Sequence, residues 1–282
     1  MVSPETQTLL ALLVPLLLVG LSAICLVGYR SRCQKTQHLG VHHLLLLKEL
    51  LMALQQHRGL SYGALNGDPA MRSRLPGLDA NINRQIEKLK GITGIRPATD
   101  HWIAFNNHWQ RLQPRNLELT AENNLTQHNR LITVVLYLIE NVAEACLLSN
   151  EIIDDGERAS ILWQQVLVAA EWLGQARALG SGVIASGVCG SVERIRMSFI
   201  RSRIESAAQH IQHQFPDPQI LQRTLGTIDL QFLEREQPDI PAREYFELIS
   251  QAIDKVLAHF DERMQGLADR LGQRDIRPTT PN

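Results

Sequence analysis

Apolar residues recur through most of this chain at the three- and four-residue spacing of amphipathic helices, and no stretch shows the period-two alternation of a half-buried strand. Pro, Gly and Asp residues interrupt the pattern and mark its turns. The pattern predicts eight helices after residue 38, at about 39–66, 69–90, 97–113, 121–153, 158–186, 192–214, 219–236 and 242–271. We therefore expect an all-α fold, whose first helix can continue back into the segment that precedes it.

The N-terminal segment differs from the rest because residues 8–29 carry no charged side chain. This uncharged stretch is long enough to form a helix that crosses a bilayer. Arg30, Arg32 and Lys35 follow directly, whereas no Lys or Arg precedes the segment. By the positive-inside rule, we expect a single-pass protein of the inner (cytoplasmic) membrane with its large domain in the cytoplasm. The expected division is an N-terminal segment 1–7, a transmembrane helix 8–29, a basic linker 30–38, a helical domain 39–271 and a disordered tail 272–282.

The composition narrows the class of protein. The chain has 282 residues, 44% of them hydrophobic, and a net charge of −1, which argues against disorder and against a nucleic-acid partner. Its four cysteines have no paired or metal-type spacing, and His38 with His42 lacks a third ligand, so no metal is expected. No motif of an enzyme or of a cofactor site is present, so we expect neither catalytic residues nor a cofactor.

An internal repeat organises the helical region. Two stretches share the pattern Q-x-R-small-L-x-x-G at a constant offset of 119 residues. The matched pairs are Gln56 with Gln175, Arg58 with Arg177, Leu60 with Leu179, and Gly63 with Gly182. The eight helices are therefore predicted to form two sets of four, each set starting with an arginine-bearing helix.

Each repeated arginine falls in the apolar stripe of its helix. The two stripes are Leu47, Leu51, Leu54, Arg58, Ser61 and Leu65, and Val166, Ala170, Leu173, Arg177, Gly180 and Ile184. A guanidinium directed at a core costs several kcal/mol unless an anion meets it. The sequence therefore predicts an anionic partner for both arginines.

Two kinds of partner fit this pattern. Arg58 and Arg177 could clamp one small planar oxyanion, because the guanidinium fork gives two parallel hydrogen bonds to such an anion. In that arrangement Gly59 and Gly180 would leave room for the ligand, and Ser61 and Ser181 would add hydroxyl donors. Alternatively, each arginine pairs with a buried carboxylate. The candidates on apolar helices are Glu140, Glu144 and Glu171.

The two motifs resemble those of the nitrate- and nitrite-sensing domain, the NIT domain. The run 54–61 is similar to its first motif, L-Q-x-E-R-G, and the run 170–179 to its second, K-E-x-x-G-x-E-R-A. The resemblance covers residues 39–270. It implies two four-helix bundles in which Arg58 and Arg177 face the ligand. His57 and Ala176 replace the acidic residue of each motif and Ala170 replaces the lysine, which leaves the identity of the anion open.

These observations support a membrane-anchored sensor that binds a small oxyanion, nitrate or nitrite. Since no room for an output domain follows the eighth helix, we expect a separate signalling protein as partner; a homodimer is left open. Two alternatives remain. One is a helical membrane adaptor that binds no ligand, and the other is a sensor of the pilus or chemotaxis type with a periplasmic domain.

Overall fold

The computed structural model describes residues 4–92, 99–153, 156–210 and 217–276; within these ranges, side chains are described from residue 17 onward, except at residues 99, 210 and 273–276. Within these ranges the chain forms eight α-helices and no strand, as the periodicity predicted. The first four are α1 (Pro4–Leu65), α2 (Pro69–Lys90), α3 (Thr99–Leu112) and α4 (Ala121–Ala145), with a 3-10 helix η1 (Gln113–Glu118) before α4. The others are α5 (Leu167–Ser186), α6 (Ser191–His210), α7 (Pro218–Ile228) and α8 (Ala242–Ile276), with π-helical turns η2 (Leu162–Val166) and η3 (Asp229–Leu233).

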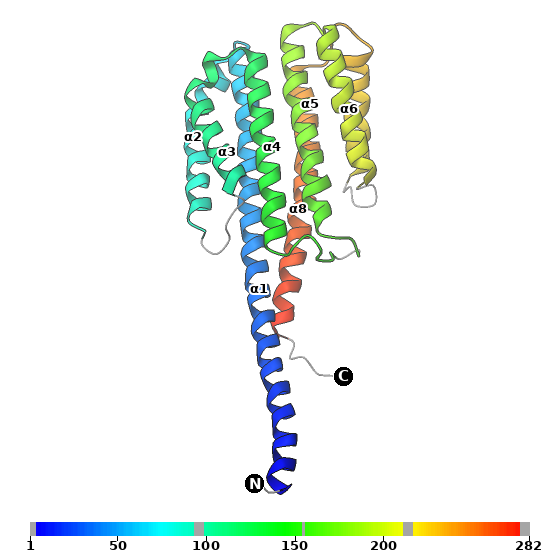
Figure 1. Ribbon diagram of the computed structural model, residues 1–282. Helices are drawn as coiled ribbons and strands as arrows, with labels where there is room; N and C mark the ends of the chain where they lie inside the picture. The colour runs from blue at the N-terminus through cyan, green and yellow to red at the C-terminus, as the bar shows by residue number, and fades with distance from the viewer. Residues whose placement is uncertain (1–3, 93–98, 154–155, 211–216, 277–282) are drawn as a thin grey trace.

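The helices form two bundles that stand side by side (Figure 1). α1 packs with α2 and α4, and α3 packs on α4, whereas α5 packs with α6 and α8, and α7 packs between α6 and α8. The two bundles meet where α1 contacts α5 and α8. The predicted division into two sets of four helices is therefore the observed architecture, and the two arginine-bearing helices lie next to one another.

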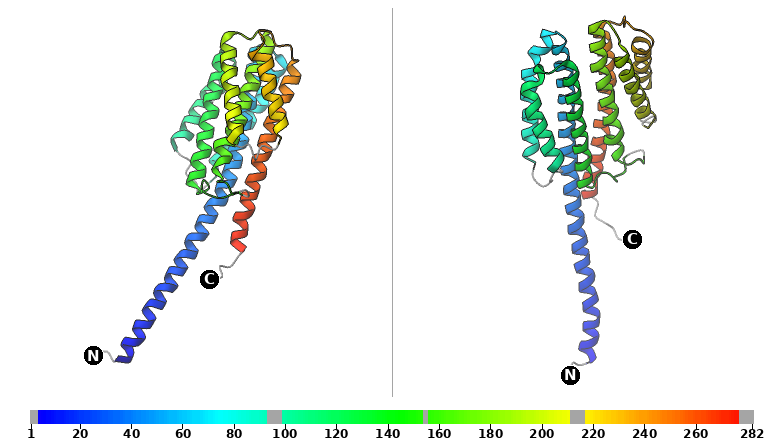
Figure 2. Two further views of the ribbon diagram at one scale, coloured as in Figure 1. Left: turned by 90° about the vertical axis from the view of Figure 1, so that its right-hand side faces the viewer. Right: turned by 45° about the horizontal axis from the view of Figure 1, so that its top comes forward.

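Two long helices leave the bundles in the same direction (Figures 1 and 2). α1 continues without a break from residue 4 to residue 65, a length of about 90 Å at 1.5 Å per residue. α8 runs beside it for part of this distance. Lys48 of α1 is buried, and its Nζ lies 2.7 and 2.9 Å from the carboxylate oxygens of Asp261 on α8. This ion pair links the long helix of one bundle to that of the other.

The turns follow from local sequence. Asp68 caps α2 by accepting hydrogen bonds from the backbone N–H groups of Ala70 and Met71, and Pro69 takes the first helical position. Thr120 caps α4 through the N–H of Asn123. Gly187 ends α5 with a φ of +74°, a left-handed conformation that glycine adopts without strain.

Several predicted boundaries are wrong or lie outside the described residues. The fourth helix was expected to reach residue 153 but ends at Ala145, because the chain turns there to bury Leu148 and Ile153 against the core. The seventh helix ends its α-helical part at Ile228 and continues as a π turn. α8 takes in the first part of the predicted tail, up to residue 276. The start of the predicted third helix, the end of the sixth and residues 277–282 lie outside the described residues.

The predicted membrane span, residues 8–29, forms the outer end of α1. The side chains of its first half lie outside the described residues. In the part of the chain whose side chains are described, no helix combines the length and the apolar character that crossing a bilayer requires.

Candidate functional site

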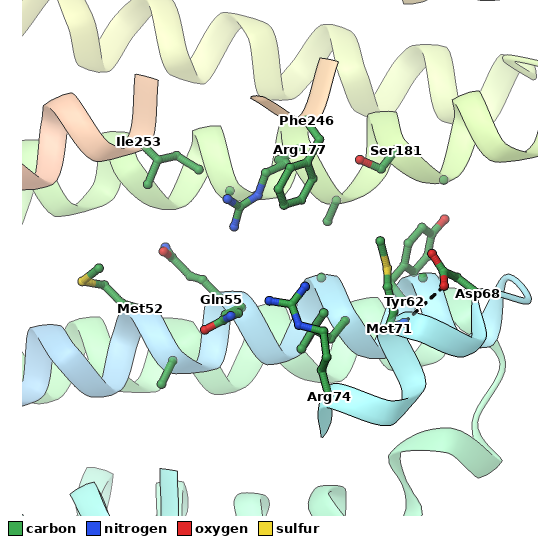
Figure 3. Close-up of a pocket in the computed structure, with 18 of the residues that line it drawn as sticks. Met52, Gln55, Tyr62, Asp68, Met71, Arg74, Arg177, Ser181, Phe246 and Ile253 are labelled. Carbon is green, nitrogen blue, oxygen red and sulfur yellow. Dashed lines mark hydrogen bonds between the residues drawn. The ribbon is translucent and has the colours of Figure 1, made fainter. Parts of the chain in front are cut away.

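A cavity of about 820 Å³ lies between the two bundles (Figure 3). Residues from α1, α2, α5 and α8 line it, including Met52, Gln55, Tyr62, Arg74, Arg177, Ser181, Phe246 and Ile253. Its walls are mainly apolar, with a few polar groups directed into the space. A pocket of this kind at a junction between bundles has the character of a small-molecule site.

Arg177 reaches into the cavity from α5 (Figure 3). Its Nη1 donates to the Ser250 hydroxyl at 2.9 Å, and its Cζ lies 4.9 Å from the ring centroid of Phe246. Among the described residues, no carboxylate lies within ion-pair distance of it, although Asp254 acts on it from further away. Burial lowers the pKa of Arg177 to about 10, with a further contribution from the positive charge of Arg58. The cavity therefore holds a desolvated cation whose charge no ion pair neutralises.

Ser181 lies one helical turn beyond Arg177 and also lines the cavity. Its Oγ is buried but has no hydrogen-bond partner among the residues that the structure describes. A buried hydroxyl without a partner costs free energy, about 1–3 kcal/mol. Ser181 thus lines the same space as Arg177, and its hydroxyl is a donor without a partner among the described residues.

Arg58 occupies a different environment. Its side chain is fully buried, and its two Nη atoms lie 2.5 and 3.2 Å from the carboxylate oxygens of Glu171 on α5. Nη1 also donates to Asn129 at 2.8 Å. Arg58 does not line the cavity. Of the three carboxylates suggested from sequence, Glu171 is the one that Arg58 meets, so this arginine has an internal partner.

Glu171 accepts hydrogen bonds from two further side chains. Gln55 donates from α1 at 2.8 Å, and Gln175 donates from the next turn of α5 at 2.9 Å. Gln55 also lines the cavity, so it stands between the Arg58–Glu171 pair and the open space. A Cβ on Gly174 would lie 2.7 Å from Arg58 Nη2, which explains why that position on α5 has no side chain.

The remaining predicted ligand residues divide between the cavity and the core. Gly59 lines the cavity, and no atom would meet a Cβ placed on it. Gly180 instead makes room for the ring of Tyr245, whose hydroxyl donates to a backbone carbonyl of α5 at 2.7 Å. Ser61 is buried in the first bundle, 3.2 Å from the Nδ1 of His57. The structure thus brings Arg177, Ser181 and Gly59 to one space and places Arg58, Ser61 and Gly180 outside it.

The three positions that depart from the NIT motifs, His57, Ala170 and Ala176, are buried and do not line the cavity. His57 is buried in the first bundle, with Nδ1 2.7 Å from His128 Nε2 and Nε2 3.0 Å from Asp79 Oδ1. Burial, followed by the neighbouring His57, lowers the pKa of His128 well below its usual value. Ala176 is buried, and its carbonyl accepts the bond from Tyr245. None of these replacements changes the lining of the cavity.

Sequence reasoning missed Gln55, Arg74 and Phe246 as cavity residues. They come from three different helices, so no local motif joins them. The sequence gives a partial indication for Arg74, because it lies next to Leu75, the first core residue of α2, and therefore close to the buried side of that helix. In the described parts of the chain, no group of three or more His, Cys, Asp or Glu residues is arranged to hold a metal ion.

Comparison with known proteins matches the chain to a family model and to a solved structure. The family model described as nitrate and nitrite sensing matches residues 49–273, which is most of the chain. The chain is similar to a solved structure of the NasR transcription antiterminator, with a TM-score of 0.64 and 15% sequence identity, over 89% of this chain and 75% of that one. At that identity the likeness concerns the fold. No curated protein matches the chain.

Proposed function

Because the chain belongs to the family of nitrate and nitrite sensing domains, we propose that it binds nitrate or nitrite in the cavity between its two bundles. Its role is binding and signalling, with no chemical step. The observation that carries this proposal is the state of Arg177, a half-buried guanidinium that lines the cavity and makes no ion pair with any of the described residues. A monoanion beside it supplies the missing charge and accepts its free N–H donors.

The neighbouring groups support the same assignment. Ser181 is on the same helix as Arg177, and its hydroxyl has no partner among the described residues. An oxyanion can accept a hydrogen bond from it. Gly59 leaves open space on the facing wall. Arg58 acts on the site through its neighbours: its charge lowers the pKa of Arg177, and its partner Glu171 holds Gln55 at the cavity wall. In the proposed mechanism Arg177 contacts the anion and Arg58 positions the wall behind it.

The signal would leave through the long helices. An anion that touches both bundles changes how they pack, and α1 and α8 extend from the two bundles in the same direction (Figure 2). A separate output protein would detect that change. We also propose that residues 8–29 anchor the protein in the inner membrane, with the bundles on the cytoplasmic side, because they carry no charge and three basic residues follow them.

Isothermal titration of the full-length protein with nitrate, nitrite, chloride and sulfate tests the ligand assignment. We expect saturable binding of nitrate or nitrite that Arg177→Gln abolishes. Arg243→Gln is the matched control, since Arg243 also lines the cavity but is exposed and paired with Glu247 at 2.7 Å. Absence of binding in the unmodified protein, or equal binding by the Arg177 variant, would overturn the proposal.

The membrane anchor has its own test. A chain that lacks residues 1–29 should move from the membrane fraction to the supernatant after cell lysis, whereas the full chain should resist extraction at high salt and high pH. A full chain that salt releases from the membrane would contradict the anchor.

The Arg58–Glu171 pair favours a second candidate function. It is the internal salt bridge expected of an adaptor whose arginines are structural. An adaptor predicts no anion-specific rise in thermal stability, whereas a sensor predicts about 2.7 kcal/mol of stabilisation at a hundredfold excess of ligand over its dissociation constant. Thermal unfolding of the full chain with each anion therefore separates the two functions.

A further inference from the structure

The cavity receives arginine side chains from both bundles. Among the described residues that line it, Arg74 comes from α2 of the first bundle, whereas Arg177 and Arg243 come from the second. Arg243 is paired with Glu247. Neither Arg74 nor Arg177 makes an ion pair within the described residues. Two guanidinium groups without an ion-pair partner among the described residues thus belong to opposite walls of one space.

The placement of Arg74 follows from how α2 packs. Asp68 caps the first turn of α2, and the sulfur of Met71 fills the space left by Gly63 of α1. Leu75 is buried in the core of the first bundle. These contacts hold the backbone of the second turn, while the Arg74 side chain itself is exposed and extends over α1 toward the side from which Arg177 enters (Figure 3).

The acidic residues of the cavity leave these two arginines unpaired. Glu49, Asp68 and Asp254 line it, and none lies within ion-pair distance of Arg74 or Arg177. Asp68 is used by the backbone of α2, and Glu49 and Asp254 are exposed. Three arginines and three acidic residues line the space, so their formal charges cancel. Such a site favours a monoanion over a multiply charged one, because the carboxylates repel additional negative charge.

Resting on the proposed function, we propose that Arg74 is the second guanidinium that contacts the anion, in the place that the repeat assigns to Arg58. A planar oxyanion has oxygen pairs on different edges, so Arg177 can bind one edge and Arg74 another. The anion then bridges α5 of the second bundle to α2 of the first. Binding draws the two walls together, which couples occupancy of the cavity to the relative position of the bundles.

Arg74→Gln tests this role beside Arg72→Gln, both in the full-length protein titrated with nitrate and nitrite. Arg72 lies two residues earlier on α2, is also exposed and does not line the cavity, so it controls for loss of one positive charge on the same helix. We expect the Arg74 variant to weaken binding about 10- to 100-fold, the loss that follows from one charge-assisted contact. The Arg72 variant should bind within about twofold of the unmodified protein, since its charge is screened.

Thermal unfolding without ligand gives the second readout. Because Arg74 is exposed and has no partner within the described residues, Arg74→Gln should leave the midpoint without ligand unchanged and should reduce the rise that nitrate causes. If the unmodified protein binds, Arg177→Gln does not and Arg74→Gln binds as tightly as Arg72→Gln, this inference is overturned and the proposed function stands. If the unmodified protein binds neither anion, the proposed function fails and this inference fails with it.

Discussion

Replacement of Glu171 by Gln should strongly destabilise the protein. The Arg58 side chain is fully buried and that of Glu171 is 5% exposed, so the variant leaves a buried guanidinium without its counter-charge. Gln keeps the shape of the side chain but offers one acceptor atom where the carboxylate accepts four hydrogen bonds. Removal of one partner of such a buried pair costs about 3–5 kcal/mol.

The assay is urea unfolding of the full-length chain, followed by tryptophan fluorescence, with Arg177→Gln as comparison. Arg177 loses a hydrogen bond to Ser250 and a contact with the Phe246 ring, and in return a desolvated charge is removed. We therefore expect its free energy of unfolding to change by no more than about 1 kcal/mol. The free energy of unfolding should thus fall by at least about 2 kcal/mol more in Glu171→Gln, which leaves Arg58 without its carboxylate, than in Arg177→Gln.

A double variant, Arg58→Met with Glu171→Leu, separates charge burial from loss of packing. Apolar residues of similar volume often replace a buried ion pair at little cost, so this variant should recover most of the stability that Glu171→Gln loses. The reasoning is refuted if Glu171→Gln unfolds within about 1 kcal/mol of the unmodified protein, or if the double variant is as unstable as the single one.

Four further variants test the packing, the ligand binding and the pH response. Gly59→Ala should stabilise α1 by about 0.5–1 kcal/mol through helix propensity, since no atom meets the new Cβ, whereas Gly180→Ala should destabilise by about 1–3 kcal/mol in the same urea assay because its Cβ meets Tyr245. Ser181→Ala should raise the unfolding free energy of the ligand-free protein by up to about 1–3 kcal/mol, because its buried Oγ has no partner among the described residues, but should weaken nitrate binding about fivefold or more. Burial lowers the pKa of His43 to about 4, so the unfolded chain binds the proton more readily, and stability should fall by up to about 3 kcal/mol as pH drops from 6.5 to 4. His43→Leu should flatten that part of the profile, and an unchanged slope would show that His43 is not the group that titrates.

The helices were predictable because each has a strong periodic stripe and clear local stops. The starts of α2 and α4 depend on local interactions of Asp68, Pro69 and Thr120 with backbone groups a few residues away. The structure confirms these two boundaries. The end of α4 was missed because its cause is tertiary. The apolar run continues past Ala145, but the chain turns there so that Leu148 packs where Gly40 of α1 leaves space. Nothing local distinguishes that run from a longer helix.

The site was predicted in part for a similar reason. The repeat correctly marked the two helices that meet between the bundles, and it marked Arg177, which is half-buried there. It could not show that Arg74 lies on the opposite wall. With the offset of 119 residues, Arg74 corresponds to Glu193, which has the opposite charge and does not line the cavity. A cavity residue that has no counterpart in the other half of the repeat can be recognised only from the packing of the two bundles.

The different environments of the two repeated arginines have a cause in the sequence. Glu171 precedes Arg177 by six residues, which places the two side chains about 120° apart on α5, so the carboxylate faces Arg58 on α1. The residue that corresponds to Glu171 in the first half is Met52, which lines the cavity and carries no charge. With an acidic residue at that position, each arginine would have had a carboxylate on the neighbouring helix. Glu171 pairs with Arg58 alone, so Arg177 has no ion-pair partner among the described residues and faces the cavity, where the proposed anion would supply one.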